Sequence, residues 1–306
     1  MSYRVAIGPS SFAEEDKTPR TLLEAAGVEV IPNPYGRRLD EAEIIALLNN
    51  VDGLIAGLEP LNRRVLASAP RLKALARVGV GMSNVDLAAA KELGIKVSNT
   101  PEGPTESVAE MTLAALLALA RQLIPSNTAL HAGKWLKIIG FGLCGIRVLL
   151  IGYGRIGRRV GQLLHFMGAE VLVDDPYIET DSLEGWEQKV SLEEGLRSAQ
   201  VISLHAAGSK ELLGTEEFKK MTEGVILLNS ARGELVNEDA LIQALDSGKV
   251  GAAWFDAFWK EPYQGRLTGY EQVLLTPHAG TYTRQCRLSM EVSAVRNLLR
   301  DLGITA

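Results

Sequence analysis

The sequence is poor in cysteine and has no basic tract. Its 306 residues include two cysteines, Cys144 and Cys286. Two cysteines cannot form a disulfide framework and are typical of a reducing compartment. The formal net charge is −5. Because nucleic-acid-binding proteins usually present a surface rich in Lys and Arg, we expect no nucleic-acid partner. No spacing of His, Cys, Asp or Glu resembles a metal site, so we expect no metal.

Long hydrophobic runs are also missing. The longest apolar run, Met111 to Ala120, is about half the length of a membrane span. Glu110 and Arg121 flank it, so it predicts a buried helix and no contact with a membrane. The N-terminus leads directly into the apolar segment Val5–Ile7 without the pattern of a signal peptide. We therefore expect a cytoplasmic protein.

Short apolar segments alternate with amphipathic ones along most of the chain. This alternation predicts βαβ units and parallel sheets. The first third carries one set, and a complete second set begins at Arg147. Between them we expect one long helix from about Thr105 to His131. Its apolar positions surround it, which indicates that both of its faces are covered.

The last helix, from about Thr283 to Leu302, has no sheet of its own to pack on. We infer that it returns to the first domain and makes that domain discontinuous. The predicted fold is α/β, with two doubly wound parallel-sheet domains. A Rossmann domain over residues 101–280 is inserted into a flavodoxin-like domain formed by residues 1–100 and 281–306.

A glycine-rich run follows the first strand of the second set. The strand Arg147–Ile151 leads into Gly152-Tyr153-Gly154-Arg155-Ile156-Gly157, and a helix follows at once. In a dinucleotide-binding turn these glycines allow the tight turn, the approach of a pyrophosphate and the close packing of the helix. Asp175 ends the next strand, where a carboxylate accepts hydrogen bonds from the ribose hydroxyls and repels a 2′-phosphate. The alternative is a glycine turn without a cofactor; the combination with Asp175 favours NAD as the cofactor.

Three polar motifs follow later strands of the same set. Arg232 follows the strand Val225–Leu228, Glu261 comes shortly after the next strand, and His278 follows Val273–Leu275. Ligands of open α/β sheets bind beyond the carboxyl ends of the strands, so these residues are expected at one edge. Histidine transfers protons near neutral pH, a carboxylate beside it orients its ring, and arginine binds a carboxylate through two parallel hydrogen bonds. The set predicts redox chemistry on a small hydroxy acid.

These features belong to a longer series of motifs. The series is Arg77-Val78-Gly79-Val80-Gly81 with Asn84-Val85-Asp86, Asn99-Thr100-Pro101, Ser107-Val108-Ala109-Glu110, the glycine run with Asp175, Asn229-Ser230-Ala231-Arg232-Gly233, Asp256 with Glu261-Pro262, and Pro277-His278-Ala279-Gly280. With them, nearly the whole chain resembles the D-isomer-specific 2-hydroxyacid dehydrogenase family. The resemblance implies an NAD-dependent enzyme that acts on a phosphoglycerate-, glycerate- or hydroxypyruvate-like substrate.

The resemblance also implies a role for each site residue. His278 would be the acid/base, Glu261 would hydrogen-bond to it, and Arg232 would bind the substrate carboxylate and polarise the carbonyl. Backbone N–H groups of Val78 and Gly79 would bind the carboxylate from the substrate domain. The expected cofactor contacts are Gly152, Tyr153, Gly154, Arg155, Ile156, Gly157, Asp175, His205, Ala206, Ala231, Asp256 and Gly280, with Asp256 on the nicotinamide carboxamide. A homodimer is implied, with the long helix in the contact.

The sequence departs from the family pattern in several places. Met82-Ser83 replaces a usual acid, Pro104 a frequent Asn, and Ala207-Gly208 a common Pro-Leu pair. Phosphoglycerate dehydrogenases typically carry an Arg after the strand near Ile55, where this chain has Gly57-Leu58-Glu59. A phosphate needs positive partners, so this loss argues against a phosphorylated substrate. Arg37, Arg38 and Arg77 are the candidates to replace the missing cation.

Two other functions are open on the same fold. Formate dehydrogenases usually lack the acidic partner of the histidine, so Glu261 argues against formate oxidation, whereas phosphite dehydrogenases retain it. A corepressor that binds NAD and partner peptides is a reading from a different class, because corepressors of this family keep the Arg, Glu and His set. We expect a compact chain without the tails of a corepressor, which argues against that reading.

Overall fold

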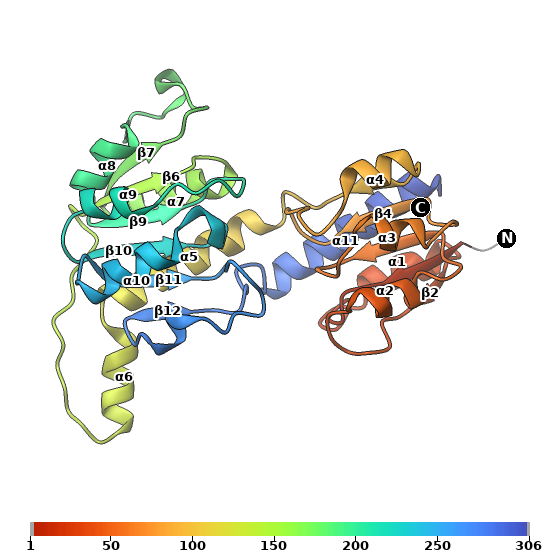
Figure 1. The fold of residues 1–306 in the computed structure, drawn as a ribbon, viewed down its shortest axis with the longest axis horizontal. Coiled ribbons are helices and arrows are strands. Elements are labelled where there is room, and N and C mark those ends of the chain that lie inside the picture. Colours follow the sequence, from red (N-terminus) through yellow and green to blue (C-terminus); the bar gives the residue numbers. More distant parts are fainter. Residues whose placement is uncertain (1–2, 305–306) are drawn as a thin grey trace. The chain divides into compact units, whose positions relative to one another are not determined.

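The computed structural model describes residues 3–304 and divides into two compact units (Figure 1). The first unit comprises residues 1–104 and 282–306, and the second comprises residues 105–281. These limits lie within a few residues of the predicted ones. The last helix, α11 (Arg284–Leu302), belongs to the first unit, so this domain is discontinuous in sequence.

The first domain is a five-stranded parallel sheet with helices around it. The strand order is β2-β1-β3-β4-β5, which is the flavodoxin-like order. Its strands are β1 (Arg4–Ile7), β2 (Glu29–Ile31), β3 (Gly53–Ala56), β4 (Ala74–Arg77) and β5 (Lys96–Ser98). Its other helices are α1 (Thr18–Ala25), α2 (Glu41–Leu47), α3 (Arg63–Ala67) and α4 (Leu87–Glu92).

Local sequence explains where these helices begin. Asp40 caps α2 through a hydrogen bond from the Glu43 N–H, and the Glu43 side chain returns the bond to the Asp40 N–H. Thr283 caps α11 by accepting the N–H of Cys286. The apolar residues of α11 pack with those of β1, β3 and β4 into one core. The C-terminal helix is therefore an integral layer of the first domain.

The second domain is a seven-stranded parallel sheet in the order β12-β11-β10-β9-β6-β7-β8. Counted from its own first strand, this is the Rossmann order with one added strand. Its strands are β6 (Arg147–Ile151), β7 (Glu170–Asp174), β8 (Glu187–Lys189), β9 (Val201–Leu204), β10 (Val225–Asn229), β11 (Val250–Phe255) and β12 (Val273–Leu275). Its later helices are α7 (Arg155–Phe166), α8 (Leu192–Ser198), α9 (Thr215–Lys220) and α10 (Glu238–Asp246), with short 3₁₀ turns at Thr180–Ser182, Gly233–Leu235 and Arg266–Gly269. Apolar clusters cover both faces of this sheet, as the near-continuous apolar strands require.

The long helix expected before this sheet is in fact two helices. α5 (Pro104–Ala120) and α6 (Leu123–His131) meet at an angle of 61°. Gln122 lies between them with a φ of 53°, a left-handed conformation that ends a right-handed helix. Among residues 3–304, no single helix has the length and apolarity of a membrane span, although this bent pair meets that test by length and composition when taken together.

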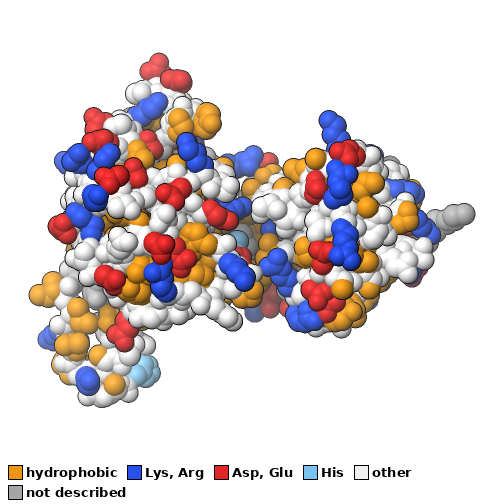
Figure 2. All heavy atoms as spheres, viewed as in Figure 1, with side chains coloured by type: hydrophobic (Ala, Val, Ile, Leu, Met, Phe, Trp, Pro, Cys, Tyr) orange, Lys and Arg blue, Asp and Glu red, His pale blue; other side chains and the backbone are white. Residues whose placement is uncertain are grey.

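The sequence predicted that both faces of the long helix are covered, but Glu106, Glu110 and Ala114 are exposed along one face of α5, so the prediction holds for one face of α5 and fails for α6. Ala115 and Leu116 of α5 are buried against the sheet, whereas no residue of α6 is buried. In Figure 1, α6 and the segment after it extend away from the sheet of their own domain. Figure 2 shows hydrophobic side chains gathered on this projection. The prediction was therefore wrong for residues 123–131.

Candidate active site

The glycine turn connects β6 to α7, and two of its glycines are required by close contacts. Gly152 has a φ of 91°, and a Cβ there would lie 2.5 Å from the Ala206 nitrogen. A Cβ on Gly157 would lie 2.3 Å from the Gly152 carbonyl oxygen. Any side chain would therefore force the turn, α7 and the loop after β9 apart.

Gly154 has a different environment. Gly154 is the N-cap residue of α7, and no side chain bonds to the first N–H groups of this helix from that position. It is exposed, and no atom lies within 4 Å of the position that a Cβ would take. The first N–H groups of a helix have no acceptor within it and carry a partial positive charge. Arg155 is exposed beside this helix start, while Ile156 packs on the core. The open Gly154 side and the helix end fit the pyrophosphate of a dinucleotide.

The predicted role of Tyr153 needs correction. Its side chain is buried, and its hydroxyl donates a hydrogen bond to Glu187 Oε1 at 2.8 Å. Burial, followed by the bond to Glu187, raises the pKa of the phenol well above its usual value. The Tyr153 N–H is also engaged, because it donates to Asp175 Oδ2. Tyr153 therefore fixes the turn from inside the domain, and its buried side chain does not offer the cofactor contact expected from the sequence.

Asp175 lies just beyond β7, with both carboxylate oxygens held by the backbone. Oδ2 accepts the Tyr153 N–H at 2.7 Å and Oδ1 accepts the Tyr177 N–H at 2.8 Å. A carboxylate has about four acceptor positions, so the two bonds orient it and leave capacity for ribose hydroxyls. Burial and then the neighbouring charge of Asp175 raise the pKa of Asp174. The geometry agrees with the ribose contact predicted for Asp175.

His205 follows β9 and packs against the glycine turn. Its N–H donates to the Ile151 carbonyl, and its Nε2 lies 2.8 Å from Ser203 Oγ. Burial lowers the pKa of its imidazole to about 4, so the ring is neutral near pH 7. Its Nδ1 is buried and has no hydrogen-bond partner within residues 3–304. A neutral, enclosed ring supports the predicted place beside the cofactor turn and not an acid/base role.

The loop after β10 presents Arg232. The buried side chain of Asn229 accepts the Ala231 N–H and donates to the Arg232 carbonyl, which fixes the loop. Only glycine fits at position 233, because a Cβ there would lie 2.3 Å from the Phe258 backbone. Within the described part of the chain the Arg232 guanidinium pairs with no carboxylate and donates only to the Ala231 carbonyl. It is therefore available to an anionic ligand.

Asp256 follows β11 and holds the loop that carries the histidine. Its Oδ1 accepts the Thr276 hydroxyl and the Ala279 N–H, and its Oδ2 accepts the Gly280 N–H. Asp256 is buried, and Trp254 Nε1 donates to the same Thr276 hydroxyl. Three acceptor positions are thus used within the domain, so the structure assigns Asp256 a positioning task. Its predicted bond to a carboxamide stays a prediction.

His278 and Glu261 are brought together from two loops. His278 Nδ1 lies 2.9 Å from both Glu261 oxygens, and Oε1 also accepts the Phe258 N–H. His278 has a φ of 52°, which is uncommon for a residue other than glycine and clusters at functional sites. Its side chain is 37% exposed. The carboxylate therefore holds Nδ1, and Nε2 is the nitrogen left to exchange a proton with a ligand.

Val78 and Gly79 lie in the first domain, in the loop after β4. Their N–H groups already have acceptors: Val78 donates to the Ala56 carbonyl and Gly79 to Thr100 Oγ1 at 2.7 Å. A substrate carboxylate would have to share these donors, so their role stays a prediction. The Arg77 guanidinium fills the space where a Gly79 Cβ would lie, which explains the glycine, whose φ is 138°.

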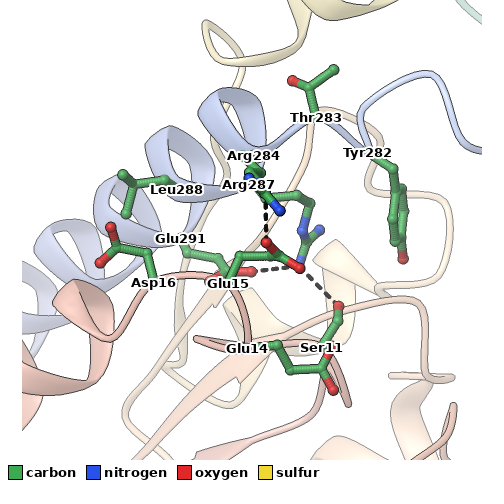
Figure 3. A pocket seen from close by; sticks show the side chains of 10 residues that line it. All are labelled: Ser11, Glu14, Glu15, Asp16, Tyr282, Thr283, Arg284, Arg287, Leu288 and Glu291. Atoms are coloured by element: carbon green, nitrogen blue, oxygen red, sulfur yellow. Dashed lines mark hydrogen bonds and ion pairs between the residues drawn. The ribbon is translucent and has the colours of Figure 1, made fainter.

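A separate pocket lies within the first domain and contains none of these residues. It has a volume of about 310 Å³ and lies between the loop after β1 and the start of α11 (Figure 3). Both of its arginines are paired with carboxylates, Arg284 with Glu15 and Arg287 with Glu291. In the described residues no group of three or more His, Cys, Asp or Glu could hold a metal ion.

Several supporting residues were not identified from the sequence. Glu187, Ser203 and Thr276 each hydrogen-bond to a side chain of the site. Ser203 and Thr276 lie in or beside strands, where their hydroxyls could have been suspected. Glu187 belongs to β8, an edge strand of three residues with no apolar alternation. Nothing in the sequence therefore indicated that Glu187 would lie next to Tyr153.

Comparison with known proteins agrees with this geometry. Residues 113–280 match the family described as D-isomer specific 2-hydroxyacid dehydrogenase, NAD binding domain. The chain is 33% identical over 276 residues to a hydroxypyruvate reductase of Thermotoga maritima, covering 87% of this chain and 90% of that protein. It is 36% identical over 252 residues to D-3-phosphoglycerate dehydrogenase 2, chloroplastic, of Arabidopsis thaliana, covering 78% of this chain. The match spans only 40% of the length of that second relative.

Solved structures resemble both domains together. The TT0316 protein of Thermus thermophilus has a TM-score of 0.90 and 34% identity, covering 98% of this chain and 97% of that one. A glyoxylate reductase of Paecilomyes thermophila has a TM-score of 0.85 and 26% identity, covering 97% and 94%. The family match extends over more than half of the chain and includes the glycine turn, Arg232, Glu261 and His278. This chain belongs to the D-isomer-specific 2-hydroxyacid dehydrogenase family.

Proposed function

We propose that the protein is an NAD-dependent oxidoreductase that interconverts a small D-2-hydroxy acid and its 2-keto acid. The observation that carries this proposal is the His278–Glu261 pair, with Nδ1 held at 2.9 Å by the carboxylate. The free guanidinium of Arg232 on a neighbouring loop supports it, because a 2-keto acid needs a cationic partner for its carboxylate.

The residues divide the reaction between them. Bound NADH would supply the hydride that reduces C2 of the keto acid. Arg232 would bind the carboxylate and withdraw charge from the carbonyl oxygen. His278 would donate the proton at Nε2 to that oxygen, so that the 2-hydroxy acid leaves with one added hydride and one added proton. In the opposite direction His278 would accept the proton as a general base.

Asp175 supports NAD over NADP. Its carboxylate is fixed by two backbone N–H groups at the end of β7, where the adenosine ribose would bind. A 2′-phosphate there would meet a negative charge that cannot turn away. We therefore propose NAD as the cofactor, consistent with the matched family domain.

The function can be tested by following NADH oxidation with hydroxypyruvate, glyoxylate, pyruvate and 3-phosphohydroxypyruvate. At least one should be reduced, and His278→Gln should lose about 100-fold or more in kcat while NADH binding persists. His165→Gln is the matched control, because His165 is exposed and stacks on Trp186. A folded protein that binds NADH but reduces none of the four acids would exclude the proposal. NAD reduction with phosphite or formate would favour the rival chemistry, and NAD binding without any turnover would favour the corepressor.

We also propose that the protein forms a homodimer through α6 and the segment after it. Leu123, Leu130, Trp135 and Ile139 are exposed there, with Trp135 at 81% and Ile139 at 96%. Contiguous apolar surface of this kind marks an interaction site, and an identical copy can bury it symmetrically. Sedimentation should give the mass of a dimer, and Ile139→Asp should shift it toward the monomer. A monomeric wild-type protein at high concentration would contradict this.

We also propose a cytoplasmic location. Neither cysteine forms a disulfide bond; Cys144 is exposed and Cys286 is buried. An exposed thiol is more common in reducing compartments than outside the cell.

A further inference from the structure

The loop that carries Glu261 is supported by a pair of stacked aromatic rings. This loop follows β11 and leads into the 3₁₀ turn Arg266–Gly269. The rings of Phe258 and Tyr263 have their centroids 4.6 Å apart and an angle of 18° between their planes. The Phe258 N–H donates to Glu261 Oε1, the oxygen that also contacts His278 Nδ1. The ring of Tyr263 therefore packs on the residue whose backbone orients the carboxylate.

The hydroxyl of Tyr263 attaches this stack to helix α10. It donates to Oε1 of Glu238, the first residue of α10, at 2.6 Å, and it accepts the Leu267 N–H at 3.2 Å. Burial and then the bond to Glu238 raise the pKa of the Tyr263 phenol to about 12, so the hydroxyl keeps its proton near pH 7. A Cβ on Gly265 would lie 2.3 Å from the same hydroxyl, so the glycine leaves the space that this group needs.

A second ring attaches the same loop to the segment after Arg232. Trp259 Nε1 donates to the Val236 carbonyl at 2.7 Å. Val236 follows the 3₁₀ turn that begins directly after Arg232. The centroid of the Trp259 six-to-five-membered ring system lies 6.1 Å from that of Tyr263. Two neighbouring rings therefore connect the Glu261 loop to the segment that runs from Arg232 into α10.

We propose that Tyr263 is a positioning residue that keeps the Glu261 carboxylate on the imidazole of His278. Its ring does so by packing on Phe258, and its hydroxyl by bonding to Glu238. The inference rests on the proposed function, because it concerns the same proton donor. Tyr263 itself takes no part in proton or hydride transfer. Side chains on loops are held less precisely than those on helices, and the bond to α10 gives this loop the support of a helix.

Tyr263→Phe tests the bond, because it keeps the ring and removes the hydroxyl. In keto-acid reduction it should lower kcat about tenfold with NADH affinity kept, since the proton donor is less well placed. The upper limb of the pH profile of kcat should move to lower pH by about half a unit or more. Reduction needs protonated His278, and a carboxylate held beside the ring favours that form. A merely structural loss would lower kcat without moving the limb.

Tyr270→Phe is the matched control. The Tyr270 hydroxyl donates to Oδ1 of Asp246, the last residue of α10, at 2.7 Å, so it forms the same kind of bond to the same helix. This variant should keep the wild-type kcat and pH profile. Glu238→Ala removes the partner of Tyr263 and should reproduce the effect of Tyr263→Phe, and the double variant should lose little more than either alone. Glu238→Gln keeps an acceptor oxygen and should stay close to the wild-type protein.

A measurement without substrate separates this inference from the proposed function. With ¹⁵N-labelled histidine, the ring nitrogens of His278 can be followed by NMR and assigned by their loss in His278→Gln. They should titrate at lower pH in Tyr263→Phe than in the wild-type protein or Tyr270→Phe. If no keto acid is reduced, the proposed function fails, and this titration still decides the role of Tyr263.

Two results would overturn the role of Tyr263: an unchanged titration of His278 in folded Tyr263→Phe, or an equal shift in Tyr270→Phe. Melting temperature and NADH affinity report whether each variant is folded. If Tyr263→Phe does not fold, Glu238→Ala tests the same bond from its other end.

Discussion

The buried imidazole of His205 makes the stability of the second domain depend on pH. Above pH 6.5 the ring is neutral in both the folded and the unfolded chain, so its contribution is constant. Burial lowers its pKa from 6.5 to about 4 in the folded state. Between these values the unfolded chain binds a proton that the folded chain excludes, and the free energy of unfolding therefore falls as the pH falls. Below pH 4 the contribution is fully lost.

The expected effect is large enough to measure. Between pH 7 and pH 5, His205 alone should reduce the free energy of unfolding by about 2 kcal/mol. Urea unfolding without cofactor, followed by tryptophan fluorescence, is a suitable assay because all four tryptophans lie in the second domain. His205→Gln should lose this pH dependence, whatever its absolute stability. Carboxylates titrate in both proteins, so their contributions cancel when the two changes in unfolding free energy are compared.

The comparison has a direct control. His165 is exposed, so His165→Gln should show the wild-type change between the two pH values. Equal changes in wild type and His205→Gln would mean that the imidazole is protonated or solvated in the folded domain. In that event the argument for a neutral ring beside the glycine turn fails.

Three further predictions concern cofactor binding and the histidine loop. Asp175→Ala should narrow the ratio of NADPH to NADH dissociation constants, and a wild-type preference for NADPH would contradict the ribose argument. Tyr153→Phe leaves a buried Glu187 oxygen without its donor and should cost about 1–3 kcal/mol in urea unfolding and weaken NADH binding; unchanged values would refute the positioning role. Thr276→Val removes the hydroxyl bond to Asp256 and should lower kcat about tenfold with NADH affinity kept; an unchanged kcat would show that the loop is held without it.

The sequence predicted the elements whose signal is local. Alternating apolar segments and the glycine turn depend on residues close together in the chain, and both parallel sheets were found as expected. The meeting of Glu261 and His278 followed from the rule that strand ends share one edge. Their side chains are 17 residues apart in sequence and form the predicted pair.

Other features depend on contacts between distant segments. Gln122 takes a left-handed conformation that nothing in its neighbourhood predicts, and the break between α5 and α6 was therefore missed. The direction of the Tyr153 side chain depends on Glu187, 34 residues further along the chain. The engagement of the Gly79 N–H depends on the position of Thr100 beyond a neighbouring strand. Such partners become visible only when the sheet register is known.

The distribution of charge at the second domain's strand ends explains why its ligand should be a single carboxylate. Asp256 is satisfied by three donors from the histidine loop, and Glu261 is occupied by His278 and the Phe258 N–H. Neither carboxylate is paired with Arg232, which in the described residues has only a carbonyl acceptor. A guanidinium at such an edge is most stable when it forms charge-assisted hydrogen bonds with an anion. Because Asp256 and Glu261 are both engaged in holding the histidine loop, we propose that the anion that pairs with Arg232 comes from the substrate, and that His278 is already oriented as proton donor when the substrate binds.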